Sequence, residues 1–140
     1  MIEFEIPGDP VAKQRPRMTK SGHVYTPEKT RQYEKLVKEA YLNHSRSWKF
    51  GKDVPLEIRI VAYFPIPKSD SNKRKNEKKM GAIRPTIKSD IDNICKSILD
   101  GLNGVAYVDD KQIVSLHASK WYAESPKVRV MILPVREEGF

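Results

Sequence analysis

Acidic side chains and one lysine recur at short spacings in the second half of the chain. Asp92, Lys96 and Asp100 are four residues apart, which places them on one face of a helix. Asp90 lies at or just before the start of this helix, where free N–H groups and the helix dipole favour a carboxylate. Carboxylate oxygens are the ligands that Mg²⁺ prefers, and a lysine beside them can stabilise charge that develops in a reaction.

Two interpretations of these residues remain open at this point. In the first, Asp90 or Ser89 only caps the helix, and Asp92, Lys96 and Asp100 form a surface ion-pair ladder worth a few tenths of a kcal/mol per pair. In the second, the turn that carries Asp109 and Asp110 folds back onto the helix, so that the carboxylates converge. A metal held there would generate hydroxide and neutralise charge on a phosphodiester.

The charge balance favours the second interpretation. The chain has 26 Lys and Arg against 18 Asp and Glu, a net charge of +8 and a pI near 9.6, which suits a polyanionic partner. Residues 68–89 are strongly basic and have few apolar side chains. We expect them to be a mobile arm that contacts DNA phosphates, although most charge runs are solvated loops. The predicted phosphate contacts are Lys73, Arg74, Lys75 and Lys88 in this arm, and Lys13, Arg15 and Arg17 near the N-terminus.

Composition excludes several other kinds of site. The single cysteine, Cys95, allows no intramolecular disulfide and no cysteine zinc site, and it falls on the apolar stripe of the predicted helix. The three histidines lack zinc-ligand spacing. No apolar run approaches the roughly 18 residues of a membrane span, and the N-terminus lacks the features of a signal peptide. We therefore expect a cytoplasmic protein that binds no membrane and no small-molecule cofactor.

Hydrophobic periodicity predicts one α+β domain over residues 1–140, in the order β-α-β-α-β-β. We expect a small mixed sheet with helices on one face. Ser69 or Asp70 is predicted to cap a short helix that ends near Met80. Residues 124–126 are predicted to form a hairpin loop between the last two strands. The predicted elements are strands over 2–6, 56–64, 113–122 and 127–133, and helices over 27–45 and 92–102.

The acidic motifs resemble those of the RusA family. That family typically reads D-x-D-N-x-x-K, then D-x-L-N-G, then D-D-x-Q-[IV], and this chain has DIDNICK at 90–96, DGLNG at 100–104 and DDKQI at 109–113. The segments GDP at 8–10, RPR at 15–17 and YTP at 25–27 resemble phage and prophage members. One departure is Ser89, where many relatives have proline; we expect it to change only how rigidly the helix is entered.

The resemblance implies a homodimeric, Mg²⁺-dependent endonuclease that resolves four-way (Holliday) DNA junctions in recombination and repair, with Mn²⁺ able to replace Mg²⁺. It implies that Asp90, Asp92 and Asp110 bind the metal and that Lys96 is the catalytic lysine. Asp100 and Asp109 match further acidic positions, although Asp109 is also placed to cap its turn. Asn93 and Gln112 are expected to hold the backbone of the site. Resolution needs two symmetric nicks, and a twofold dimer of single-site domains supplies them.

Two other functions fit the same residues. One is a DNA-binding module without catalysis, in which the acidic cluster is structural. The other is a nuclease for flaps, replication forks or RNA, because the chemistry of the site would be the same and only the docking surface would differ. Tyr107 and Trp121 are predicted to lie in the core or an interface, with a role in wedging a DNA strand as the alternative.

Overall fold

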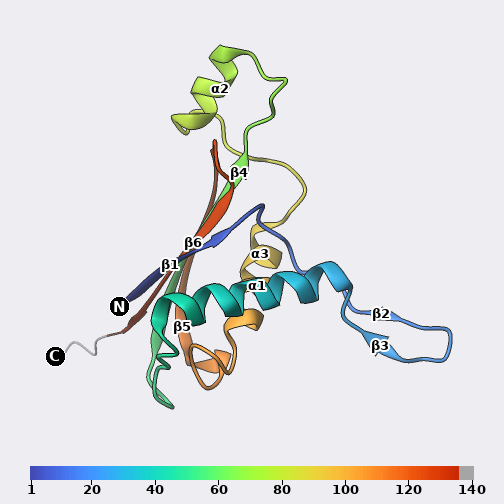
Figure 1. Ribbon diagram of the computed structural model, residues 1–140, viewed down its shortest axis with the longest axis vertical. Coiled ribbons are helices and arrows are strands. Elements are labelled where there is room, and N and C mark those ends of the chain that lie inside the picture. The colour runs from blue at the N-terminus through green and yellow to red at the C-terminus, as the bar shows by residue number, and fades with distance from the viewer. Residues whose placement is uncertain (136–140) are drawn as a thin grey trace.

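A four-stranded mixed sheet forms the body of the protein in the computed structural model, which describes residues 1–135 (Figure 1). The strands lie in the order β1-β6-β4-β5. β4 pairs with β6 antiparallel and with β5 parallel, and β6 pairs with β1 antiparallel. The predicted α+β class and mixed sheet are thus confirmed. The strand bounds are β1 Ile2–Pro7, β4 Leu56–Pro65, β5 Ile113–Ala123 and β6 Lys127–Pro134.

The predicted hairpin between the last two strands is wrong, because β4 lies between β5 and β6. Parallel neighbours such as β4 and β5 need a crossover connection, which contains helix α3 (Ile91–Leu102). Residues 124–126 then carry the chain past the end of β4 to its other side. β4 is therefore a central strand, and Val61 and Tyr63 make its second face partly apolar.

Helices α1 (Glu28–Ser45) and α3 cover one face of the sheet (Figure 1). Alternate residues of β4 from Leu56 to Phe64 point into the core beneath them. Gly101, which we predicted as part of a helix stop, lies inside α3 where it crosses α1. A Cβ atom at Gly101 would lie 2.9 Å from the carbonyl oxygen of Glu34 and from Cβ of Val37. Glycine here lets the two helices pack closely.

Helix α2 (Asn72–Lys79) lies beyond the end of β4, apart from α1 and α3 (Figure 1). The placement of helices on one face is therefore right for α1 and α3 and wrong for α2. The cap of α2 is Ser71, whose side chain accepts a hydrogen bond from the N–H of Arg74. Neither Ser69 nor Asp70 caps the helix, because Asp70 instead binds the buried ammonium of Lys78.

The basic arm buries few side chains, in line with its few apolar residues, but those it buries anchor it to the sheet. The side chain of Lys78 is only 6% exposed and lies over the ring of Tyr122 in β5. Pro85 is buried as well. The mobility of the arm in the absence of DNA stays a prediction.

A short hairpin of β2 (Arg17–Met18) and β3 (Val24–Tyr25) projects from the body where we expected a loop (Figure 1). None of the helices within residues 1–135 is both long and apolar enough to span a membrane.

Candidate active site

The start of α3 presents two carboxylates that its own backbone does not use. Asp90 is the N-cap residue, as predicted, but its side chain accepts no capping hydrogen bond. Asp92 lies in the first turn, and both side chains are exposed. An N-cap aspartate normally satisfies one of the free N–H groups of the helix. Because Asp90 does not, its carboxylate is available to a ligand.

The interpretation of α3 as a surface ion-pair ladder is wrong. Within residues 1–135, no ion pair joins Asp92 to Lys96 or Lys96 to Asp100. Asp100 instead accepts a hydrogen bond from the ammonium of Lys13, which also lies 3.0 Å from Glu34 of α1. The ammonium of Lys96 is thus left exposed and without a carboxylate partner in the described part of the chain.

Lys13 was predicted to contact a DNA phosphate, and in the structure its ammonium is paired within the protein. Its ammonium is engaged by two carboxylates and its side chain is 18% exposed. Burial disfavours its charged form, but the hydrogen bonds and negative charges of Asp100 and Glu34 outweigh burial, and the net pKa of Lys13 is raised. Its N–H also donates to the carbonyl of Asn93 in α3, at 2.9 Å. Contact between Lys13 and DNA stays a prediction.

The turn after α3 folds back onto the helix, as predicted. The hydroxyl of Tyr107 is buried and donates to the carbonyl oxygen of Leu99 at 2.9 Å. Burial raises the pKa of Tyr107, and the nearby charges of Asp110 and Asp100 raise it further. Tyr107 is fully buried, so it cannot wedge a DNA strand.

Asp109 and Gln112 hold the backbone that carries Asp110. Asp109 caps the 3₁₀ helix η1 (Asp110–Gln112) and accepts a hydrogen bond from the N–H of Lys111 at 3.0 Å. The buried side chain of Gln112 accepts hydrogen bonds from two N–H groups, those of Val108 and Asp109, and donates to the carbonyls of Gly51 and Val54. The structural roles predicted for Asp109 and Gln112 are confirmed. Asn93 contributes its backbone carbonyl to Lys13.

Asp92, Lys96, Asp100 and Asp110 line one hollow of about 390 Å³. Cys95, Leu99 and Leu116 give this hollow an apolar side. Hydrogen bonding with Asp109 raises the pKa of Asp110, and burial and the charges of Asp109 and Asp100 act in the same direction. The N–H of Lys111 and the contact with Asp110 lower the pKa of Asp109.

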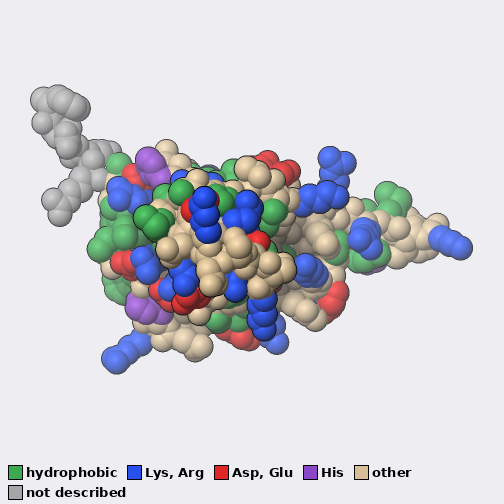
Figure 2. All heavy atoms as spheres, turned by 90° about the horizontal axis from the view of Figure 1, so that it is seen from above, with side chains coloured by type: hydrophobic (Ala, Val, Ile, Leu, Met, Phe, Trp, Pro, Cys, Tyr) green, Lys and Arg blue, Asp and Glu red, His purple; other side chains and the backbone are tan. Residues whose placement is uncertain are grey.

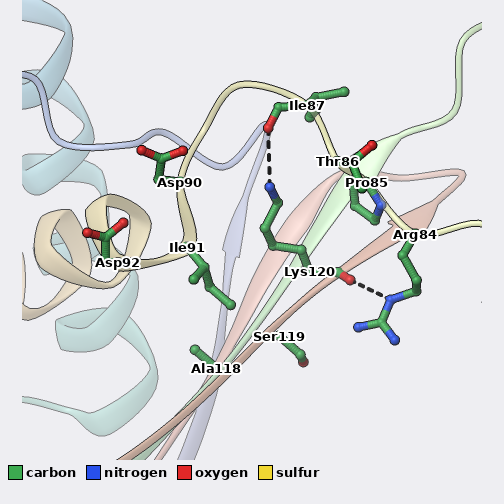
Figure 3. A pocket seen from close by; sticks show the side chains of 10 residues that line it. All are labelled: Arg84, Pro85, Thr86, Ile87, Asp90, Ile91, Asp92, Ala118, Ser119 and Lys120. Carbon is green, nitrogen blue, oxygen red and sulfur yellow. Dashed lines mark hydrogen bonds between the residues drawn. The ribbon is translucent and has the colours of Figure 1, made fainter.

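Two more hollows meet the same end of α3. One of about 610 Å³ lies between the carboxylates of Asp90 and Asp92 and the cations Arg84 and Lys120 (Figure 3). The other, of about 380 Å³, is bordered by Asp90 and by three lysines. Asp92 thus borders the hollows of about 390 and 610 Å³, and Asp90 borders those of about 610 and 380 Å³. The three lysines are Lys13, Lys29 and Lys88.

Comparison with known families decides the class of this site. The family described as "Endodeoxyribonuclease RusA" matches residues 7–133. The chain belongs to the RusA family. A relative from Bacillus subtilis (strain 168), named "Uncharacterized protein YqaN", is 38% identical over 139 residues, and the match covers 96% of each of the two chains. The family assigns the chain to the endodeoxyribonucleases, which hydrolyse phosphodiester bonds within DNA.

The carboxylates of this RusA-family chain fit a hard divalent cation by their chemistry. Asp90 and Asp92 share one hollow and Asp92 and Asp110 share another, and Mg²⁺ commonly takes one or two carboxylates with water and phosphate oxygens. The described residues do not bring three or more acidic, histidine or cysteine side chains together as ligands of one ion. The three aspartates therefore border connected hollows without forming one tight cluster.

The backbone is strained at Ser89, where this chain departs from the RusA pattern. Ser89 has φ +129°, a conformation that costs a non-glycine residue about 1–3 kcal/mol. Proline is fixed near φ −65°, so the residue found in many relatives cannot adopt this backbone. The strain lies directly before the N-cap carboxylate of Asp90, and it helps to set the direction in which α3 begins.

Basic side chains surround the RusA site. Figure 2 looks onto the α2 end and shows Lys and Arg side chains gathered there and along the projecting hairpin. All the predicted phosphate contacts other than Lys13 and Lys75 are exposed, namely Arg15, Arg17, Lys73, Arg74 and Lys88. Arg84, Lys120 and Lys29 border the hollows but were not predicted from the sequence as site residues. The only sequence signal for Arg84 was its place in the basic arm. The position of Lys120 at the site follows only from the register of β5 against β4.

Cys95 takes no part in the chemistry. It is 4% exposed, and burial together with the charge of Asp92 raises its pKa to about 11. A thiol with a raised pKa is a poor nucleophile at neutral pH, so the core role predicted for Cys95 is confirmed.

Proposed function

We propose that the protein is a Mg²⁺-dependent endonuclease that resolves four-way DNA junctions as a homodimer, in recombination and repair. The observation that carries this proposal is the end of α3, where Asp90, Asp92 and Lys96 have no ion-pair partner within residues 1–135 and border hollows rimmed by basic side chains. Exposed charges that no group of the described residues pairs are free to bind a metal ion or a phosphate oxygen. Family membership supplies the DNA substrate.

The division of labour that we propose combines the family motif with the residues that line the hollows. Asp90, Asp92 and Asp110 would hold the ion, which when bound supplies an activated water and neutralises charge on the phosphate. Lys96 lines the hollow of Asp92 and Asp110 and can donate to a phosphate oxygen or to the attacking water. Asp100 is held by Lys13, so it contributes negative charge to the hollow without being free to bind. Asp109 caps η1 and thereby orients Asp110.

The exposed edge of the sheet supports the homodimer. β5 is an edge strand, and its side chains Val114 and Leu116 are 61% and 45% exposed. The opposite edge, β1, carries Glu3 and Glu5, and charges of this kind protect an edge from pairing. Antiparallel pairing of the β5 edges of two protomers would form one continuous sheet, with the twofold axis perpendicular to it. Both sites would then lie on the same face of that sheet.

Cleavage of model substrates tests the enzyme. End-labelled four-way junction, flap, fork and linear duplex would each be incubated with protein in Mg²⁺, Mn²⁺ or EDTA and read on denaturing gels. We expect paired symmetric nicks in the four-way junction with either metal and none in EDTA. Preferred cutting of flaps or forks would make the protein a structure-specific nuclease of another kind. Binding without cutting on any substrate would favour a non-catalytic module.

The oligomeric state tests the β5 edge. Light scattering should give twice the 16.1 kDa mass of one chain. Val114→Lys should shift this mass toward the monomer because it places charge on the proposed edge. Met80→Lys is the matched control, since Met80 is 79% exposed beyond the sheet, and it should leave the dimer intact. A Val114→Lys protein that stays dimeric would exclude this interface.

A further inference from the structure

Lys120, a cation that no comparison assigns, faces the carboxylates of the site across the hollow of about 610 Å³, which Arg84 also borders. Lys120 of β5 lies beside Ala62 in the sheet register, on the face covered by α3. Its ammonium donates one hydrogen bond, to the carbonyl of Ile87 at 3.3 Å, and has no ion-pair partner within residues 1–135. It shares the hollow with Asp90 and Asp92 without contacting either (Figure 3). Most of its donor capacity is therefore unused.

Arg84 borders the same hollow, but its guanidinium lies on the other face of β5 and points away from Asp90 and Asp92 (Figure 3). Its guanidinium lies 3.3 Å from the ring centroid of Trp121, and its Nε donates to the carbonyl of Lys120 at 2.7 Å. These contacts fix the plane of the guanidinium and leave its two terminal nitrogens without a hydrogen-bond partner in the described structure (Figure 3). A fixed guanidinium fork is suited to phosphate oxygens and loses little entropy on binding.

Trp121 is the anchor that brings the arm to this position. A Cβ atom at Gly81 would lie 2.7 Å from Cζ3 of the Trp121 ring, and Gly81 has φ +81°. Only glycine permits both the conformation and the approach. The indole is thus occupied by Gly81 and Arg84, and it is not free to act as a wedge in DNA.

From these contacts we infer that the hollow of Arg84 and Lys120 is a subsite for a DNA backbone phosphate next to the one that is cut. The inference rests on the proposed function. Lys120 attracts a phosphodiester and Arg84 adds positive charge at the rim, while the negative charges of Asp90 and Asp92 keep the phosphodiester on the side of Lys120. The hollow of about 610 Å³ has room for a phosphate and its sugar. Binding there holds the strand in register with the carboxylates.

Binding in EDTA tests the subsite separately from cutting. Lys120→Met keeps most of the aliphatic stem and removes the ammonium, which lies 5.6 Å from the ring centroid of Phe64, and Lys120→Arg restores a cation. We expect Lys120→Met to weaken binding of a labelled four-way junction by about tenfold and to reduce the slope of log affinity against log salt by about one. Lys120→Arg should bind within about threefold of the wild type. Lys38→Met, at an exposed position of α1, is the control and should bind as the wild type does.

A neutral phosphate then locates the contact. Junctions with a single methylphosphonate at each position around the cut are compared for wild type and Lys120→Met, with the thermal midpoint confirming that the variant is folded. At one position beside the cut, the methylphosphonate should weaken binding of the wild type about tenfold and of Lys120→Met hardly at all. If the methylphosphonate and Lys120→Met weakened binding independently at every position, the subsite would be overturned. A Lys120→Met protein that binds as the wild type does would overturn it as well. Failure of the proposed function would appear instead as wild-type protein that binds but never cuts.

Discussion

Lys13 binds Asp100 across 87 residues of chain, and this pair separates the structural acid of α3 from its unpartnered acids. Lys13 also binds Glu34, so one ammonium joins the N-terminal segment to both α1 and α3. Asp92 and Asp90, at the other end of α3, have no comparable partner in the described residues. Asp100 is thus fixed in a packing contact, while Asp90 and Asp92 stay open to a ligand.

Loss of the Lys13 ammonium should destabilise the fold without removing a catalytic group. Lys13→Met is expected to lower the free energy of unfolding by about 1 kcal/mol, near the upper end for partly exposed pairs. Denaturant unfolding at pH 7 measures the change. Lys29→Met, at an exposed position of α1, is the control. Equal stability of wild type and Lys13→Met would show that the pair contributes nothing.

The same pair predicts a dependence on alkaline pH. The pKa of Lys13 is raised in the folded protein above its ordinary value of 10.5, so its contribution is fully present below pH 10.5 and is lost as the pH rises through the folded pKa. The stability difference between wild type and Lys13→Met should thus be constant from pH 7 to about pH 10 and shrink above it. A difference that grows at high pH would contradict the assigned pairing.

The exposed and the buried basic side chains of α2 should respond differently to neutralisation. Replacing Lys73, Arg74 and Lys75 together by glutamine should weaken junction binding and flatten its salt dependence. Stability should change little, because none of the three is buried and Arg74 makes only one long contact, of 4.0 Å, with Asp70. Lys78→Met should lower stability instead, since it leaves Asp70 without its partner. Salt titration of binding and thermal unfolding measure the two effects. An unchanged salt slope for the triple variant would place α2 away from DNA.

Ser89 should reveal whether the strained turn positions Asp90. Ser89→Gly removes the cost of φ +129° and should raise the free energy of unfolding by about 1 kcal/mol. Ser89→Pro cannot keep this backbone, so it should lower both stability and cleavage. Unfolding and initial cleavage rates are measured for both variants. A Ser89→Pro protein that is as stable as wild type would mean that the backbone before α3 adopts the form found in relatives with proline.

Local patterns predicted the elements and the acidic positions, since periodicity and helix-cap chemistry depend on neighbours in sequence. The apolar stripe of α3 and the N-cap position of Asp90 are of this kind. The roles of Asp109 and Gln112 were also predictable, because a capping box joins residues three apart.

Long-range arrangements were not predictable from the sequence. The insertion of β4 between β5 and β6 depends on which strand edges pair, and a short 124–126 connection fits a hairpin equally well. The i,i+4 spacing of α3 favoured a ladder, but Lys13 competes for Asp100 from a distant segment. The subsite of Lys120 required both the register of β5 and the path of the arm around Trp121, and neither leaves a local trace.

The most direct test of the account is cleavage and binding of a four-way junction by Asp92→Asn. Asp92 borders two of the three hollows along α3, so its loss should reduce cutting in Mg²⁺ by about 100-fold or more. Junction binding should be kept or strengthened, because negative charge near phosphates is removed. Asp53→Asn, at an exposed loop position, serves as the control and should cut normally. Normal cutting by Asp92→Asn would contradict the assignment of the active site to this end of α3.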